Sequence, residues 1–103
     1  MAVPKQLVVT LTGAAQQVTT DRMITTVFVS IQPAAANTNP VYVGASNAIT
    51  SSAYGVRLPA PVDSIPPAPY IMEPWKLGVQ MPLSSVWLIG TLNEKVHLLY
   101  WEG

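Results

Sequence analysis

The chain has 103 residues, of which 50% are hydrophobic and only 10% are charged, and its five basic and five acidic side chains leave a formal net charge of zero. This length predicts one domain, residues 1–103, whose core is large enough to fold without a metal ion or a disulfide. The chain has no cysteine, which excludes disulfides, a thiol nucleophile and cysteine-based metal sites.

The surface must be mostly uncharged, since a typical soluble domain carries about a quarter charged residues. No run of Lys and Arg is present for phosphate groups, so we expect no nucleic-acid partner. A neutral surface gives little protection from self-association, which favours a surface that other subunits cover. The alternative is a monomer with a polar, uncharged surface that no other subunit covers.

The first residues, "MAVPKQLVV", lack the long apolar core of a signal peptide. No window reaches the roughly 18 apolar residues of a membrane span. We therefore expect no membrane partner, no export by a cleaved signal and folding in a cytoplasm, which the absence of cysteine also fits.

Alternation with a period of two residues predicts strands throughout the chain, and no segment shows a helical period. In "QLVVTLTG" the apolar residues Leu7, Val9 and Leu11 share one face, and Gly13 ends the strand. This pattern is typical of a half-buried strand.

The second strand is predicted in "RMITTVFVSIQP", with Val27, Val29 and Ile31 on one face. "VYVG", residues 41–44, predicts a short strand that a glycine stops. Weaker signals predict a strand at residues 48–51, a turn near Gly55 and a short strand through Val56 and Leu58.

The segment 59–82, "PAPVDSIPPAPYIMEPWKLGVQMP", contains seven of the ten prolines of the chain. Proline donates no backbone hydrogen bond and fixes φ, so this segment cannot be a central strand or an uninterrupted helix. It carries too much apolar bulk for a solvated linker.

The last twenty residues, "SSVWLIGTLNEKVHLLYWEG", predict a β-hairpin in which "NEK" joins two arms and residues 96–101 return. Short strands with Gly and Pro between them indicate an all-β fold. The predicted architecture is a small β-sandwich or jelly-roll-like barrel with a proline-rich extended segment.

No constellation of side chains indicates catalysis. His97 is the single histidine, no "GxSxG" turn is present, and a metal site would need further ligands. Asp63 and Glu73 lie in the proline-rich segment without the signature of a glycosidase pair, and no phosphate-binding glycine motif occurs. We expect no enzyme, no catalytic residue, no metal and no cofactor.

The aromatic residues Trp75, Trp87, Tyr100 and Trp101 are candidates for a carbohydrate-stacking platform or an interface, with core packing as the alternative. Core packing is favoured for Trp87. Tyr100 and Trp101 point to opposite faces of one strand, so one of them must leave the core unless both faces are covered.

Three stretches carry a resemblance to known proteins: "LTGAAQQVTTD", then "TTVFVSIQPAAANTNPVYVGASNAITSSAYGVRLP", then the late β-hairpin. In this order they resemble the small head-decoration and fibre-base proteins of tailed bacteriophages. The resemblance implies a compact β-sandwich or jelly roll that assembles on the virion as a symmetric oligomer, and it supplies no catalytic residues. The chain departs from the pattern in its proline-rich segment.

Two hypotheses explain that segment. It is an arm, stiffened by proline so that little entropy is lost on docking against a neighbouring subunit or capsid surface, or it covers an open edge of its own sandwich. The predicted interface residues are Ile65, Tyr70, Ile71, Met72, Trp75, Leu77 and Trp101.

The sequence thus predicts a virion structural protein, a capsid decoration or cement protein that stabilises the phage head. Its expected partners are further copies of itself and the major capsid protein or another virion protein. The alternatives are a receptor- or glycan-binding module of a head fibre or tail, and a component of the head–tail connector.

Overall fold

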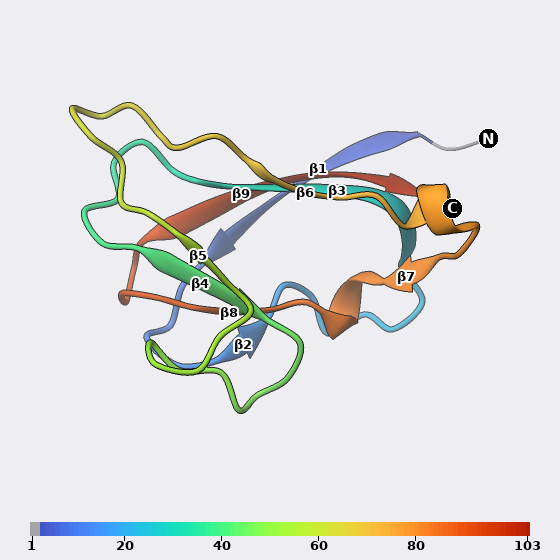
Figure 1. The fold of residues 1–103 in the computed structure, drawn as a ribbon, viewed down its shortest axis with the longest axis horizontal. Helices are drawn as coiled ribbons and strands as arrows, with labels where there is room; N and C mark the ends of the chain where they lie inside the picture. The colour runs from blue at the N-terminus through green and yellow to red at the C-terminus, as the bar shows by residue number, and fades with distance from the viewer. Residues whose placement is uncertain (1–2) are drawn as a thin grey trace.

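The computed structural model describes residues 3–103 as two antiparallel sheets that pack face to face (Figure 1). Sheet A has the order β1, β9, β3, β6, with β7 also beside β3, and sheet B has the order β2, β8, β4, β5. The strands of sheet A are β1 (Pro4–Thr10), β3 (Thr25–Pro33), β6 (Tyr70–Met72), β7 (Met81–Pro82) and β9 (Lys95–Glu102). Those of sheet B are β2 (Gln16–Gln17), β4 (Val41–Gly44), β5 (Val56–Leu58) and β8 (Trp87–Ile89).

Strands of the first half of the chain pair with strands of the second half. β1 lies beside β9, β2 beside β8 and β3 beside β6, while β4 and β5 form the innermost pair. The prediction of a small all-β sandwich is confirmed. The predicted late hairpin is wrong, because β8 belongs to sheet B and β9 to sheet A.

Residues 90–94 form the crossing between the two sheets. Gly90 stands where a Cβ atom would lie 2.7 Å from Leu11 Cδ1, so the chain passes close to the core at this point. Asn93 N–H then donates to the Leu11 carbonyl at 2.9 Å. A short polar connection such as "NEK" is compatible with a hairpin or with this crossing, and only the packing decides between them.

The core fills the space between the sheets, as the alternation of apolar residues requires. On β9, Val96, Leu98 and Tyr100 point inward, and on β1 Val9 does so. The buried hydrophobic cluster comprises Val9, Leu11, Val18, Val29, Ile31, Val41, Val43, Leu58, Leu83, Val86, Leu88, Val96, Leu98 and Tyr100.

The start of β3 departs from the predicted face. The pairing with β9 shifts between Thr26 and Phe28, which is a β-bulge with one extra residue on β3. As a result Thr26 is fully buried while Val27 is half-buried, so the prediction that Val27 shares the buried face of Val29 is wrong.

The predicted strand at residues 48–51 is also wrong, because this stretch forms turns. The Thr50 hydroxyl accepts the backbone N–H groups of Ser52 and Ala53 at 3.1 and 3.0 Å. Such side-chain bonds to nearby backbone compete with a strand ladder. The strands at residues 41–44 and 56–58 are confirmed.

The proline-rich segment runs along the β3 edge of sheet A and pairs with it twice. β6 pairs with the second half of β3, and β7 pairs with its first two residues. Between them lies a short 3₁₀ turn, η1 (Pro74–Leu77). These strands are edge strands, which is where proline is tolerated. Of the two hypotheses for the segment, the intrachain cover fits β6 and β7, since both pair with β3 of the same chain. Contact of the segment with a neighbouring subunit stays a prediction.

A second 3₁₀ turn, η2 (Leu83–Ser85), follows β7. Within residues 3–103, no helix has the length and hydropathy to cross a membrane.

Candidate interaction surfaces

Strand β6 separates buried from exposed side chains in the proline-rich segment. Tyr70 and Met72 are half-buried against the core, whereas Ile71 points outward and is 46% exposed. Gln32 of β3 adds a further attachment, since its Nε2 donates to the Pro67 carbonyl at 2.9 Å. Ile71 is therefore presented by a fixed backbone.

The turn η1 presents two more apolar side chains. Its first residue, Pro74, is buried, while Trp75 is 55% exposed and Leu77 is 81% exposed. Gly78 ends the turn with a left-handed φ of 69°, and its N–H donates to the Trp75 carbonyl at 3.1 Å. The Lys76 ammonium lies 5.7 Å from the centre of the Trp75 ring.

The charges beside Trp75 largely cancel. Lys76 Nζ is 3.2 Å from Glu73 Oε2, three residues earlier. An exposed pair of this kind contributes little to stability, but it leaves the apolar surface of η1 next to a neutral pair. A partner that covers Trp75 and Leu77 would meet no uncompensated charge there.

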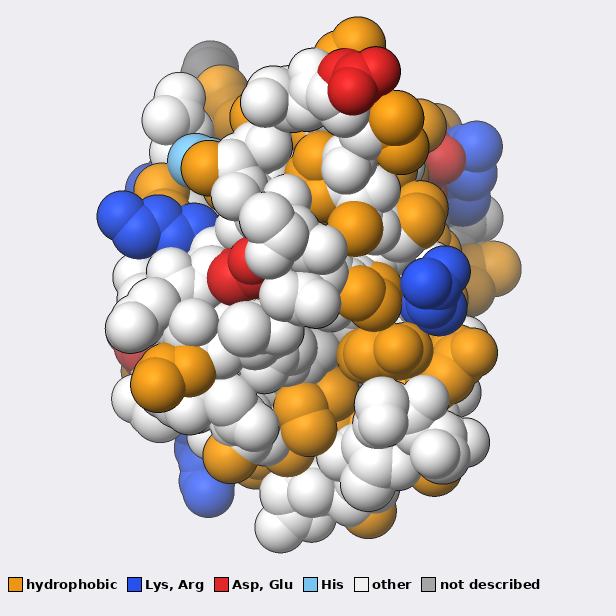
Figure 2. Space-filling model, turned by 90° about the vertical axis from the view of Figure 1, so that its left-hand side faces the viewer, with side chains coloured by type: hydrophobic (Ala, Val, Ile, Leu, Met, Phe, Trp, Pro, Cys, Tyr) orange, Lys and Arg blue, Asp and Glu red, His pale blue; other side chains and the backbone are white. Residues whose placement is uncertain are grey.

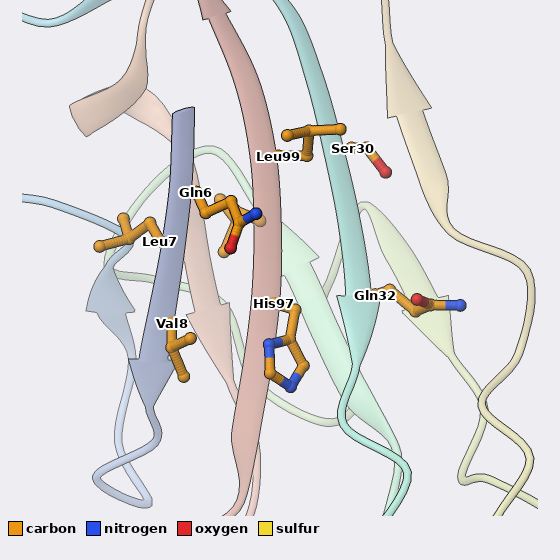
Figure 3. A pocket seen from close by; sticks show the side chains of 8 residues that line it. Gln6, Leu7, Val8, Ser30, Gln32, His97 and Leu99 are labelled. Carbon is orange, nitrogen blue, oxygen red and sulfur yellow. The ribbon is translucent and has the colours of Figure 1, made fainter. Parts of the chain in front are cut away.

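The outer face of sheet A is a second candidate surface, on which polar and apolar side chains are mixed. Registers across the sheet place Gln6, Leu99 and Ser30 in one row, with Ile71 beyond them, and Val8, His97 and Gln32 in the next. Figure 3 shows the His97 ring between Val8 and Gln32, in a shallow depression of about 290 Å³.

At the end of the same face, Phe28 and Trp101 form an edge-to-face pair with ring centres 5.0 Å apart. Trp101 is half-buried on this face while Tyr100 lies in the core, so the prediction that the two point to opposite faces is confirmed. Trp87 is half-buried on sheet B. The aromatic residues predicted to form a platform are thus dispersed over four places, which are the turn η1, sheet B, the core and the outer face of sheet A.

The loop of residues 59–69 forms part of one end of the molecule, where Val62 and Ile65 are exposed, Ile65 to 69%. Figure 2 looks onto this end: hydrophobic side chains form a broken band across it, and only a few charged side chains are seen on this face. The loop that carries Ile65 and the turn η1 that carries Trp75 and Leu77 lie toward opposite ends of the molecule in Figure 1, so these side chains do not form one patch.

Of the seven predicted interface residues, four are substantially exposed and three are half-buried. The exposed ones are Ile65, Ile71, Trp75 and Leu77. The half-buried ones are Tyr70, Met72 and Trp101. Tyr70 and Met72 instead line an apolar cleft of about 300 Å³ at the open side of the sandwich, opposite Val43 and Val56 of sheet B.

A site that sequence reasoning missed lies beside sheet B. The rings of Tyr42 and Tyr54 are 4.8 Å apart, and Tyr54 is exposed. Tyr42 also borders a depression of about 410 Å³ whose polar lining includes Asn39, Thr50, Ser51 and Thr91. The two tyrosines are twelve residues apart, in a region where no sequence motif marks a site. The pairing of β4 with β5 brings the loop that carries Tyr54 back beside Tyr42.

His97 is exposed on the outer face of sheet A together with Leu99, as its position in the strand predicts. In the described part of the chain, no group of three His, Asp or Glu side chains is placed to hold a metal ion. The contacts of His97 are those of a strand surface residue.

Comparison of the chain with protein-family models, with curated proteins and with solved structures finds no match.

Proposed function

We propose that this protein is a structural subunit of a tailed-phage virion, a decoration or cement protein that docks on the assembled head. The observation that carries the proposal is the arrangement of the proline-rich segment. Six of the twelve large hydrophobic side chains exposed on residues 3–103 lie within residues 59–82, less than a quarter of the chain. Of these, Trp75, Leu77 and Val79 lie on η1 or directly after it, and Leu77 and Val79 border one depression of the surface. Neighbouring exposed apolar side chains of this kind mark interaction sites.

The attachment of the segment supports a docking role. Since β6 and β7 are held by β3, Ile71 and Trp75 are already in place before a partner arrives. Little conformational entropy remains to be lost on binding. The neutral surroundings of Trp75 keep the desolvation cost of the contact low.

The strand order also supports the proposal. Leaving β7 aside, β1 to β9 form eight strands in which the first four pair with the last four in reverse order across two sheets. This is the jelly-roll arrangement, which recurs in viral capsid and lectin domains. A fold alone does not define a function, but this one agrees with the resemblance of the sequence to phage decoration proteins.

A decoration protein acts by many weak contacts. One copy buries a small apolar surface, and symmetric copies on a shell add their contacts through avidity. Bridges between neighbouring capsomers would raise the barrier to their separation.

Binding to assembled heads of the encoding phage tests the proposal. We expect saturable co-sedimentation with expanded heads, at a copy number that matches the symmetry of the shell, and slower release of DNA from decorated heads on heating. Absence of the chain from purified virions, together with no binding to heads, would contradict the proposal.

The second candidate function is recognition of a glycan on the host surface. Tyr42 and Tyr54 supply aromatic faces beside the hydroxyl and amide groups of Thr50, Ser51 and Asn39. Sugars are bound by such combinations of stacking and hydrogen bonding. Saturable binding of host polysaccharide by the isolated protein, lost in Tyr54→Ala but not in Trp75→Ala, would favour this function over cement.

A further inference from the structure

The β1 edge of sheet A differs from the other sheet edges of residues 3–103. β1 has seven residues, whereas the other edge strands, β2, β5 and β6, have two or three. β5 is followed by Pro59 and Pro61, and Pro69 precedes β6. β1 pairs only with β9, and Figure 3 shows it as the outermost strand of its face. A long open edge is a template for another strand.

The hydrogen-bonding pattern identifies which groups of this edge are free. Leu11 N–H donates to the Glu94 carbonyl at 2.8 Å, in continuation of the β1–β9 pairing. Backbone groups alternate in direction along an antiparallel strand. Leu7 and Val9 therefore direct their N–H and C=O groups toward β9, and Gln6 and Val8 direct theirs away from the sheet.

The two ends of the open edge are partly blocked. Pro4 has an outward carbonyl but no N–H to offer. At the other end, the Gln16 Nε2 donates to the Thr10 carbonyl at 3.2 Å, and its Oε1 accepts the Thr12 N–H at 2.8 Å. The free edge therefore consists of the four backbone groups of Gln6 and Val8, with the Pro4 carbonyl and the Thr10 N–H at its two ends.

We propose that this edge is the dimer contact of the protein, in which β1 of a second copy pairs antiparallel with it about a two-fold axis at Leu7. In this register Gln6 of each chain lies opposite Val8 of the second copy. The two pairs exchange four backbone hydrogen bonds, and the Thr10 N–H of each copy lies opposite the Pro4 carbonyl of the second copy. The four-strand path β1–β9–β3–β6 of each copy joins into one sheet of eight strands.

The side chains are compatible with this register. The two Leu7 side chains meet on the inner face at the axis, where each is already half-buried against its own core. Lys5 faces Val9 of the second copy, and the two Lys5 residues are about 14 Å apart along the strands, beyond the screening length at physiological salt. Each Lys5 is in addition paired with its own Glu102 at 3.1 Å.

The contact is small, so we expect a dimer that forms with rising concentration and that supplements the weak contacts of each copy with a shell. It lies at the opposite edge of sheet A from β6. An experiment can therefore contradict the dimer without contradicting the docking of the proline-rich segment, and the reverse is also true.

A charge-exchange experiment tests both the contact and its register. One variant carries Gln6→Lys and Val8→Lys, and the other carries Gln6→Glu and Val8→Glu. Both positions are exposed, and circular dichroism checks that each variant is folded. Sedimentation velocity from micromolar to submillimolar concentration measures association.

We expect the wild type to dimerise, each variant alone to remain a monomer because like charges face each other, and an equimolar mixture to form a heterodimer. The control is Ser52→Lys with Ala53→Lys, which adds the same charge at exposed positions of the turn between β4 and β5, away from β1, and should dimerise as the wild type does.

Three results would overturn the proposal: a wild type that is monomeric at every concentration, a like-charged variant that dimerises as strongly as the wild type, or a mixture that does not associate. A second variant tests the backbone contact alone. Val8→Pro removes one outward N–H and should abolish the dimer, whereas Val8→Thr keeps that N–H and should retain it.

Discussion

Asn37 is bonded through its side-chain amide to the backbone of Lys95, fifty-eight residues later. Asn37 Nδ2 donates to the Lys95 carbonyl at 2.7 Å, and Lys95 N–H donates to Asn37 Oδ1 at 3.0 Å. Asn37 is buried, and the amide replaces a strand neighbour at the start of β9. Close by, the Glu94 carboxylate accepts the backbone N–H groups of Thr38 and Asn39. The loop after β3 is thereby fixed to the crossing between the sheets.

Replacement of Asn37 should destabilise the protein. In Asn37→Ala the partly buried Lys95 N–H loses its acceptor, which costs about 1–3 kcal/mol. Urea denaturation followed by circular dichroism measures the loss. The matched control is Asn39→Ala, an exposed residue of the same loop, whose effect should stay within about 0.5 kcal/mol. Equal stability of the two variants would contradict the role of Asn37.

The Thr26 hydroxyl should hold β7 on β3. It is fully buried and donates to the Met81 carbonyl at 2.9 Å. Thr26→Val keeps the shape but removes the donor, and we expect a loss of about 1–3 kcal/mol in the free energy of unfolding. Thr26→Ser keeps the hydroxyl. In hydrogen exchange, the backbone amides near Met81 should therefore stay better protected in Thr26→Ser than in Thr26→Val. The reverse order would show that the methyl group, not the bond, matters here.

Gly44 should tolerate no side chain, because a Cβ atom at this position would overlap Ile49. We expect Gly44→Ala to lower the free energy of unfolding by about 1–3 kcal/mol through overpacking. Addition of Ile49→Ala creates room for the new methyl group. The double variant should therefore be more stable than the sum of the two single effects predicts. Additive effects in a thermal denaturation cycle would refute the contact.

The sequence predicted what depends on local alternation and missed what depends on long-range pairing. The buried face of Val9 and Leu11 and the strand at residues 41–44 follow from side-chain period alone. The bulge near Thr26 adds one residue that no pattern marks. The assignment of β8 and β9 to different sheets depends on partners far away in the chain.

The candidate surfaces divide in the same way. Exposure of Trp75 and Leu77 agrees with the expectation that proline keeps the segment out of a central sheet. The inward direction of Tyr70 and Met72 was missed, because three residues among prolines give no alternation to read. The open edge of β1 could not be predicted either. A strand lies at an edge because no second strand pairs with it, and local alternation does not reveal this.

The most direct test of the central claim measures the binding of exposed apolar residues of the proline-rich segment to assembled phage heads. Trp75→Ser with Leu77→Ser should leave the fold intact, since both side chains are exposed, and should weaken binding to heads by at least about tenfold. Leu92→Ser, at an exposed leucine of the crossing between the sheets, is the control and should bind as the wild type does. If the double variant and the wild type saturate heads at the same concentration, docking through this segment is contradicted.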